Sequence, residues 1–193
     1  SVVINDDNTP MVVYHGSPNS GIAEFTHTPD WRLWSASGAT SEDDLKSLED
    51  RKANQMDAIG TWFGELIDKA KNWTARLDNK DGAVYSVYLS LKNPKRYDSW
   101  QALVKDFNDT VYGPEGTKAG QEKPRHLAQA MAEGGRDAFR DKLKREGHDG
   151  VIVHDPKGID DSRGIPQTYY ITLYPKQSRI IKEEPHTRAE ADY

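Results

Sequence analysis

The chain has 193 residues, of which 35% are hydrophobic and 30% are charged, and its formal net charge is −5. This acidic balance argues against binding to DNA or RNA through a broad basic face. The absence of cysteine excludes disulfides, thiolate zinc sites and cysteine nucleophiles. No apolar run approaches the length needed to span a membrane, and no signal-peptide pattern opens the chain.

The predicted elements follow from apolar runs bounded by Gly, Pro, Asn or Asp, and from stretches of helical composition. In chain order they are a strand at 11–14, a helix at 41–53, a strand at 59–64, a helix at 65–77, a strand at 83–91, a helix at 126–145, and strands at 150–153 and 169–174. Strands before and after a helical middle favour an α+β fold over alternating βαβ units.

These elements predict a single domain over residues 1–193, with its core at 11–181. We expect irregular insertions at about 19–58 and 99–125, because residues 19–40 show no clear period and residues 108–124 are rich in Gly, Pro, Thr and Lys. These segments flank the proposed pocket, so we expect them to determine acceptor specificity. The charged tail, residues 182–193, is expected to be frayed.

The first candidate motif is the run Val13-Tyr14-His15-Gly16-Ser17. A histidine at a strand end, followed by glycine, presents an imidazole beside a backbone that a ligand can approach closely. Taken alone, a strand-end histidine is more often a turn residue that bonds to its neighbours.

The second motif is the stretch from Gly60 to Trp73, in which a strand leads into a helix with aromatic residues on both. An aromatic surface next to a histidine suits a flat ring such as nicotinamide. The alternative is that Trp62, Phe63 and Trp73 are core residues.

The remaining motifs are strands. The run from Gly82 to Pro94 is typical of a central strand and its stop, whereas 147–153 and 167–177 are two strands joined by an Asp-rich loop. Two His and two Asp lie between His148 and Asp155, but turn and strand-end roles explain them better than a metal does. We therefore expect no metal site.

In this order, the motifs resemble the ADP-ribosyltransferase superfamily, in the branch shared by diphtheria toxin, the poly(ADP-ribose) polymerases and the domains of bacterial and phage toxin or polyvalent proteins. The resemblance runs from about residue 11 to residue 181. It implies a split β-sandwich of two antiparallel sheets with flanking helices.

The resemblance also implies roles in binding NAD. His15 would bond the adenine-side ribose, the Gly16 backbone would hold the nicotinamide carboxamide, and Trp73 would stack on the nicotinamide ring with Trp62 on the other side. The same two motifs assign Tyr14, Ser17, Phe63 and Ala70 to the NAD site. At Ala70 many family members carry a Ser that bonds the carboxamide.

One position departs from the family pattern. Tyr169 stands where the resemblance places the catalytic Glu, and a phenol carries no negative charge at neutral pH. Gln167 lies two residues earlier, so its side chain points to the same face of the strand. Gln167 is thus a candidate for the ribose contact, and Asp160 or Asp161 for the charge. We assign His15, Trp62, Gln167 and Tyr169 to the catalytic group.

The function implied by the resemblance is an NAD-dependent mono-ADP-ribosyltransferase, a bacterial or bacteriophage toxin or effector domain that uses NAD as its substrate. Its acceptor would be a macromolecule, protein rather than nucleic acid, and it would act in the cytoplasm, as part of a larger protein. The alternatives are an NAD glycohydrolase and an NAD- or ADP-ribose-binding module. The missing Glu favours the binding module.

Overall fold

The computed structural model describes residues 2–5, 7–17, 20–25, 59–71, 73–74, 82–112, 138–158 and 164–186. The helix expected at 41–53, the first part of the helix expected at 126–145, and the Asp160-Asp161 pair lie outside these ranges. None of the helices within them is both long enough and apolar enough to cross a membrane.

Seven strands form one sheet in the order β4-β5-β6-β2-β1-β3-β7. Their bounds are β1 Val12–Ser17, β2 Thr61–Gly64, β3 Gly82–Leu89, β4 Lys95–Tyr97, β5 Gly150–Asp155, β6 Gln167–Thr172 and β7 Ser178–His186. Two helices complete the labelled elements, α3 at Ile67–Lys71 and α4 at Trp100–Tyr112, and residues 138–145 are also helical. The predicted α+β class is confirmed.

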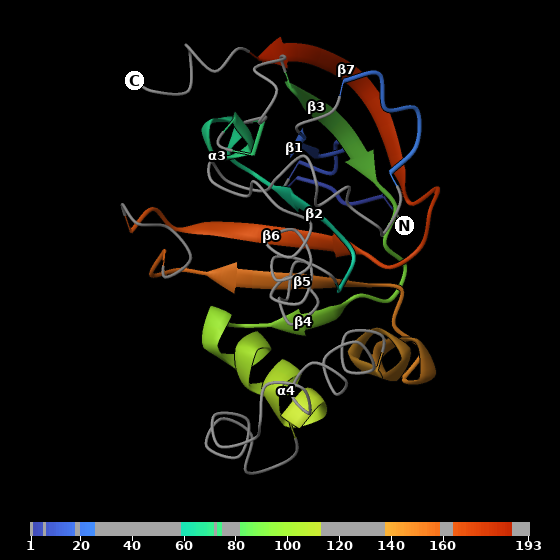
Figure 1. Cartoon of the computed structure of the whole chain (residues 1–193), viewed down its shortest axis with the longest axis vertical. Helices are drawn as coiled ribbons and strands as arrows, with labels where there is room; N and C mark the ends of the chain where they lie inside the picture. Colours follow the sequence, from blue (N-terminus) through green and yellow to red (C-terminus); the bar gives the residue numbers. More distant parts are fainter. Residues whose placement is uncertain are drawn as a thin grey trace, which may run out of the picture.

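The sheet divides into two halves where β1 meets β2. These two strands share a single pair of facing residues, Tyr14 and Gly64, whereas β1 pairs with β3 along its whole length. Figure 1 shows β4, β5 and β6 running across the molecule while β3 and β7 curve over above them. The two expected sheets are therefore two halves of one hydrogen-bonded sheet. Its pairs are antiparallel except β4 with β5, which is parallel.

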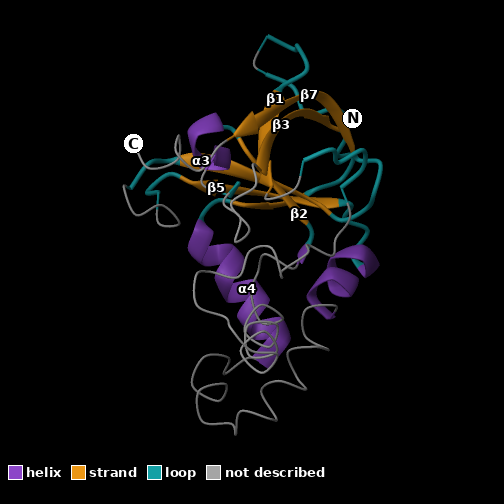
Figure 2. Ribbon diagram, turned by 45° about the horizontal axis from the view of Figure 1, so that its top comes forward, coloured by secondary structure: helices purple, strands orange, loops and turns teal. Residues whose placement is uncertain are grey.

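Two apolar clusters hold this arrangement together. One lies where β5 and β6 meet the helices, and includes Leu103, Phe107, Phe139 and Leu143, which are all at most 2% exposed. The other lies between the two halves of the sheet, where Phe63 and Tyr170 pack with residues of β1 and β3. Figure 2 shows α4 beneath the strands, and α3 above β5 and next to β1 and β3. Each buried side chain of this size stabilises the fold by about 2 kcal/mol.

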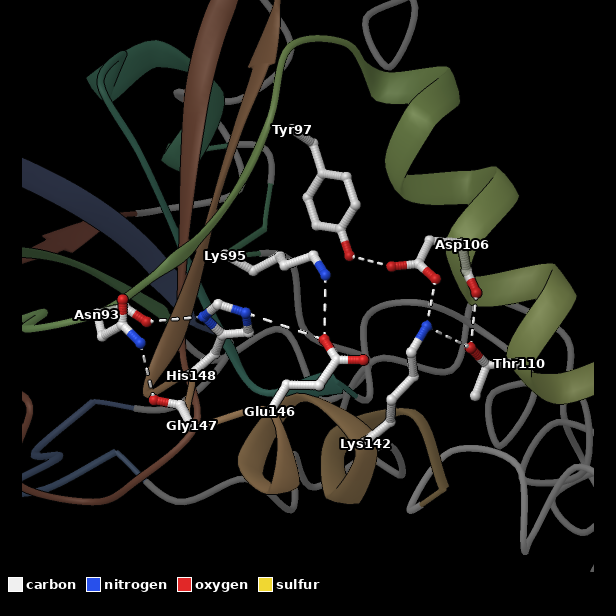
Figure 3. A network of polar contacts seen from close by, with 9 residues as sticks. All are labelled: Asn93, Lys95, Tyr97, Asp106, Thr110, Lys142, Glu146, Gly147 and His148. Carbon is white, nitrogen blue, oxygen red and sulfur yellow. Dashed lines mark hydrogen bonds and ion pairs between the residues drawn. The ribbon is translucent and has the colours of Figure 1, made fainter.

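A polar network ties α4 to its neighbours (Figure 3). The Asp106 carboxylate accepts hydrogen bonds from the Tyr97 hydroxyl at 2.6 Å and from the Lys142 ammonium at 2.5 Å. Burial acts to raise the pKa of Asp106, but the bonds from Lys142 and Tyr97 outweigh it, and the pKa is lowered. A second ion pair, Lys95 with Glu146 at 3.0 Å, joins β4 to the end of the 138–145 helix. These bonds hold the two helices against the β4 edge.

Two expectations are wrong. Residues 100–112 are not irregular, because Trp100, Leu103 and Phe107 recur at helical spacing and α4 buries this face against β5. Residues 182–186 are not frayed, because they belong to β7, which pairs with β3. Strand β7 has few buried residues, so backbone hydrogen bonds hold it in the sheet. For the same reason its sequence has little of the apolar pattern by which a strand is predicted. Strand β4 was not predicted for the same reason.

Candidate functional site

The first part of the candidate site is the contact between β1 and α3. A Cβ atom on Gly16 would lie 1.7 Å from the carbonyl oxygen of Ala70 and 3.0 Å from the Cβ of Trp73. Only glycine fits there, because any side chain would overlap the helix backbone. The structure thus brings together three residues that the resemblance assigned to nicotinamide. The Trp73 side chain beside them is half-exposed, at 52%.

His15 lies one residue earlier on β1 and makes a defined hydrogen bond. Its Nδ1 is 2.7 Å from the backbone carbonyl oxygen of Trp62. A carbonyl oxygen only accepts, so Nδ1 carries the proton and donates it. The rings of Phe25 and Phe63 lie 4.7 and 5.5 Å from the imidazole. Burial lowers the pKa of His15 to about 4, although the bond to Trp62 acts to raise it. His15 is therefore neutral near pH 7, and Nε2 is a hydrogen-bond acceptor.

Adjacent residues of β2 serve different parts of the site. Phe63 faces His15, whereas Trp62 points to the opposite side of the strand, as alternation requires. There Trp62 lies 5.9 Å from the ring of Tyr169 and 5.8 Å from that of Trp100. Trp62 and Tyr169, both predicted site residues, thus meet in an aromatic cluster with Trp100.

Tyr169 is also the centre of a buried polar cluster. Its hydroxyl accepts hydrogen bonds from the Lys69 ammonium at 2.7 Å and from the Gln167 side-chain amide at 2.5 Å. Gly64 makes room for this arrangement, since a Cβ there would lie 2.9 Å from the Gln167 Oε1. The predicted pairing of Gln167 with Tyr169 on one face is confirmed.

Two buried atoms of this cluster have no hydrogen-bond partner: the Gln167 Oε1 and the Trp62 Nε1. If the amide nitrogen and oxygen of Gln167 exchange positions, the nitrogen becomes the atom without a hydrogen-bond partner. The amide therefore keeps one unpaired atom in either orientation. An unmatched buried polar atom costs about 1–3 kcal/mol. A hydroxyl group can both donate to the Gln167 Oε1 and accept from the Trp62 Nε1.

Asp155 is a buried carboxylate on the strand that pairs with this part of β6. It stands directly opposite Gln167 in the β5–β6 register and is 1% exposed. Directly opposite residues share a face, with Cβ atoms about 5 Å apart. Glu65 belongs to the other face, where it accepts bonds from the Tyr170 hydroxyl at 3.0 Å and the Thr168 amide at 3.2 Å.

Two further predicted residues, Tyr14 and Ser17, lie on β1. Tyr14 pairs with Gly64 at the division of the sheet, and Ser17 is buried at the end of β1. Within the described ranges, no group of three or more His, Asp or Glu residues is arranged to hold a metal ion.

Sequence reasoning missed Lys69, Trp100, Phe25 and Asp155. The sequence pointed to Lys69 as a site residue only through its position four residues before Trp73 in the helix expected at 65–77. That position does not determine which strand the Lys69 side chain contacts. Asp155 was considered only for a metal site. Its place opposite Gln167 depends on strand register.

The fold agrees with the comparison against known protein families. The family model of the ADP-ribosyltransferase found in polyvalent proteins matches residues 5–187. The chain belongs to this family. No curated protein and no solved structure matches it.

Proposed function

We propose that this domain binds NAD and transfers a single ADP-ribose unit to a macromolecule. The observation that carries the proposal is the hydrogen bond between His15 and the backbone carbonyl of Trp62. The Nδ1–H of His15 is committed to the Trp62 carbonyl, and its neutral Nε2 is an acceptor for the hydroxyl of a ribose. The family membership supports NAD as the ribose donor.

The nicotinamide end of NAD would lie against Trp73 and the Gly16 backbone. The half-exposed indole offers a face for stacking. The missing side chain at Gly16 lets α3 pack close to β1, and this packing places Trp73 beside the Gly16 backbone. The Trp62 indole N–H and the Gln167 amide, both buried with an unmatched atom, would bond a ribose hydroxyl.

The negative charge that Tyr169 lacks would come from Asp155. Breaking the bond between nicotinamide and ribose creates positive charge on the sugar, and a buried carboxylate stabilises that charge strongly. Asp155 shares a face with Gln167 and Tyr169, so its charge acts on the same ribose. Asp160 and Asp161, the other candidates for this charge, lie outside the described residues.

In the proposed reaction the C–N glycosidic bond breaks and neutral nicotinamide leaves with the bonding electrons. A nucleophile of the acceptor then forms the new bond to the anomeric carbon and releases its proton. The net charge of −5 favours a protein acceptor over a nucleic acid. We place the domain in a multidomain bacterial or phage toxin or effector that acts in the cytoplasm.

One observation favours a second candidate, an NAD- or ADP-ribose-binding module. The Lys69 ammonium contacts Tyr169, where the resemblance would place a carboxylate. A cation there opposes the positive charge of the sugar in the transition state. NAD glycohydrolysis, with water as acceptor, is the third possibility.

The test is to incubate the protein with NAD and a cell lysate while following nicotinamide release and ADP-ribose transfer together. Transfer that is lost in His15→Ala supports the transferase. Nicotinamide release without transfer indicates a glycohydrolase. NAD binding without release indicates the binding module, and the absence of binding contradicts all three.

A further inference from the structure

A row of three side chains crosses one half of the sheet. His15 on β1 stands opposite Tyr85 on β3, and Tyr85 stands opposite Glu183 on β7. Residues directly opposite each other in a sheet point to the same face. The row therefore runs from His15 to the edge strand along a single face.

Residues 20–25 lie over this row and contact each of its members. The Gly21 amide donates to the Glu183 carboxylate at 2.7 Å, and the Ile22 amide donates to the Tyr85 hydroxyl at 3.1 Å. At the end of the segment, the ring of Phe25 meets His15 edge-on at 4.7 Å. Phe25 also lies 5.3 Å from Tyr85 and is 6% exposed.

We infer that Glu183 and Tyr85 are positioning residues for the ligand contact of His15, because they hold the segment 20–25 that presses Phe25 against the imidazole. With Phe25 and Phe63 beside the ring and Nδ1 bonded to Trp62, the imidazole has one orientation. Nε2 is the nitrogen left for a ligand. The inference rests on the proposed function only in taking His15 as the residue that contacts NAD.

The direction in which the pKa of His15 changes in suitable variants tests the inference. Among the residues that the structure describes, His15 contacts two phenyl rings and a backbone carbonyl, and the titratable groups along the row are Tyr85 and Glu183. Removing the Glu183 charge alone lowers the pKa of His15 or leaves it unchanged. Releasing the segment admits water to the imidazole and raises the pKa toward the ordinary value of 6.5. The two effects have opposite signs.

The experiment measures the pKa of His15 by NMR of the imidazole, assigned with His15→Gln, together with the dissociation constant for NAD. Phe25→Ala removes the ring, and Glu183→Ala combined with Tyr85→Phe removes both acceptors but keeps the aromatic ring. Glu183→Gln keeps an acceptor for Gly21 without the charge. Glu184→Ala is the control, because Glu184 is the next residue of β7, points to the other face and pairs with Lys182.

We expect Phe25→Ala and the double variant to raise the pKa of His15 by about one unit or more and to weaken NAD binding about tenfold. Glu183→Gln and Glu184→Ala should match wild type in both. A pKa that stays near 4 in Phe25→Ala and in the double variant overturns the inference, as does a raised pKa with unchanged NAD affinity. A raised pKa in a protein whose wild type does not bind NAD supports the positioning role and rejects the proposed function.

Discussion

The Nζ of Lys69 lies 2.7 Å from the hydroxyl of Tyr169, and both side chains are buried. Lys69 comes from a five-residue helix and Tyr169 from a strand 100 residues later. Their contact gives the site a cation and a phenol at the position where the resemblance places a carboxylate. Whether the domain cleaves NAD or only binds it depends on the charge near this position. Substitutions of Tyr169 and Asp155 test that dependence.

Tyr169→Glu should raise the rate of nicotinamide release about tenfold or more, because it adds a negative charge beside the breaking bond. Tyr169→Gln is the matched control, with similar size and no charge. The measurement is the initial rate of nicotinamide release at saturating NAD. Equal rates in the two variants would show that charge at this position does not limit cleavage.

Asp155→Asn should lower kcat about a hundredfold and leave NAD affinity within about threefold, because the lost charge matters mainly in the transition state. Asp98→Asn, at an exposed position after β4, is the control. Single-turnover cleavage and calorimetric titration with NAD give the two quantities. If Asp155→Asn cleaves NAD at the wild-type rate, Asp155 is not the source of the charge.

Gly16→Ala should lower the free energy of unfolding by about 3 kcal/mol or more, because the new methyl group would lie 1.7 Å from the Ala70 carbonyl oxygen. Gly164→Asn is the control. Gly164 has a φ of 68°, which asparagine tolerates, and an added Cβ there meets no atom of the described residues within 4 Å. Urea denaturation followed by Trp fluorescence measures both, and a Gly16→Ala protein as stable as wild type would contradict the β1–α3 packing.

His15 should make the protein less stable in mild acid. Its pKa is about 4 in the folded state and 6.5 ordinarily, so between these values the unfolded chain binds a proton that the folded chain does not. Stability is unaffected by this group above pH 6.5 and falls as the pH drops from 6.5 toward 4.

Between pH 7 and pH 4.5, wild type should therefore lose roughly 2 kcal/mol more stability than His15→Gln, which cannot titrate there. Urea denaturation at the two pH values measures this difference. Equal losses in the two proteins would mean that His15 is not kept neutral by burial.

Asp106→Ala should lower the free energy of unfolding by about 2 kcal/mol, because it leaves the Lys142 ammonium and the Tyr97 hydroxyl without their shared acceptor. Asp109→Ala is the control on the same helix. It removes a pair with Lys105, whose side chain is 76% exposed, and should change the melting temperature by at most about 1 °C. Thermal unfolding followed by circular dichroism gives the melting temperature of each variant. Equal decreases in the two variants would show that the Asp106 network stabilises the fold no more than an exposed ion pair does.

The α+β class and most strands follow from local pattern. The β-branched and aromatic residues at 83–91 and 150–153 predict strands wherever they pair, and β3 and β5 confirm both. The run from Val13 to Ser17 and the aromatic stretch from Gly60 to Trp73 lie far apart in the sequence, and the structure brings them together where Gly16 meets Trp73.

The chemistry around Tyr169 was decided by tertiary structure. Lys69 reaches Tyr169 because α3 packs beside β1 and β2, and Asp155 faces Gln167 because β5 and β6 pair in one register. A shift of one residue would turn Asp155 to the other face. The sequence by itself determined which segments become strands and that His15 and Gly16 stand together, because these depend on neighbours in the chain. Which charges meet at the site depends on hydrogen bonding between strands far apart in sequence, and only the folded sheet determines that.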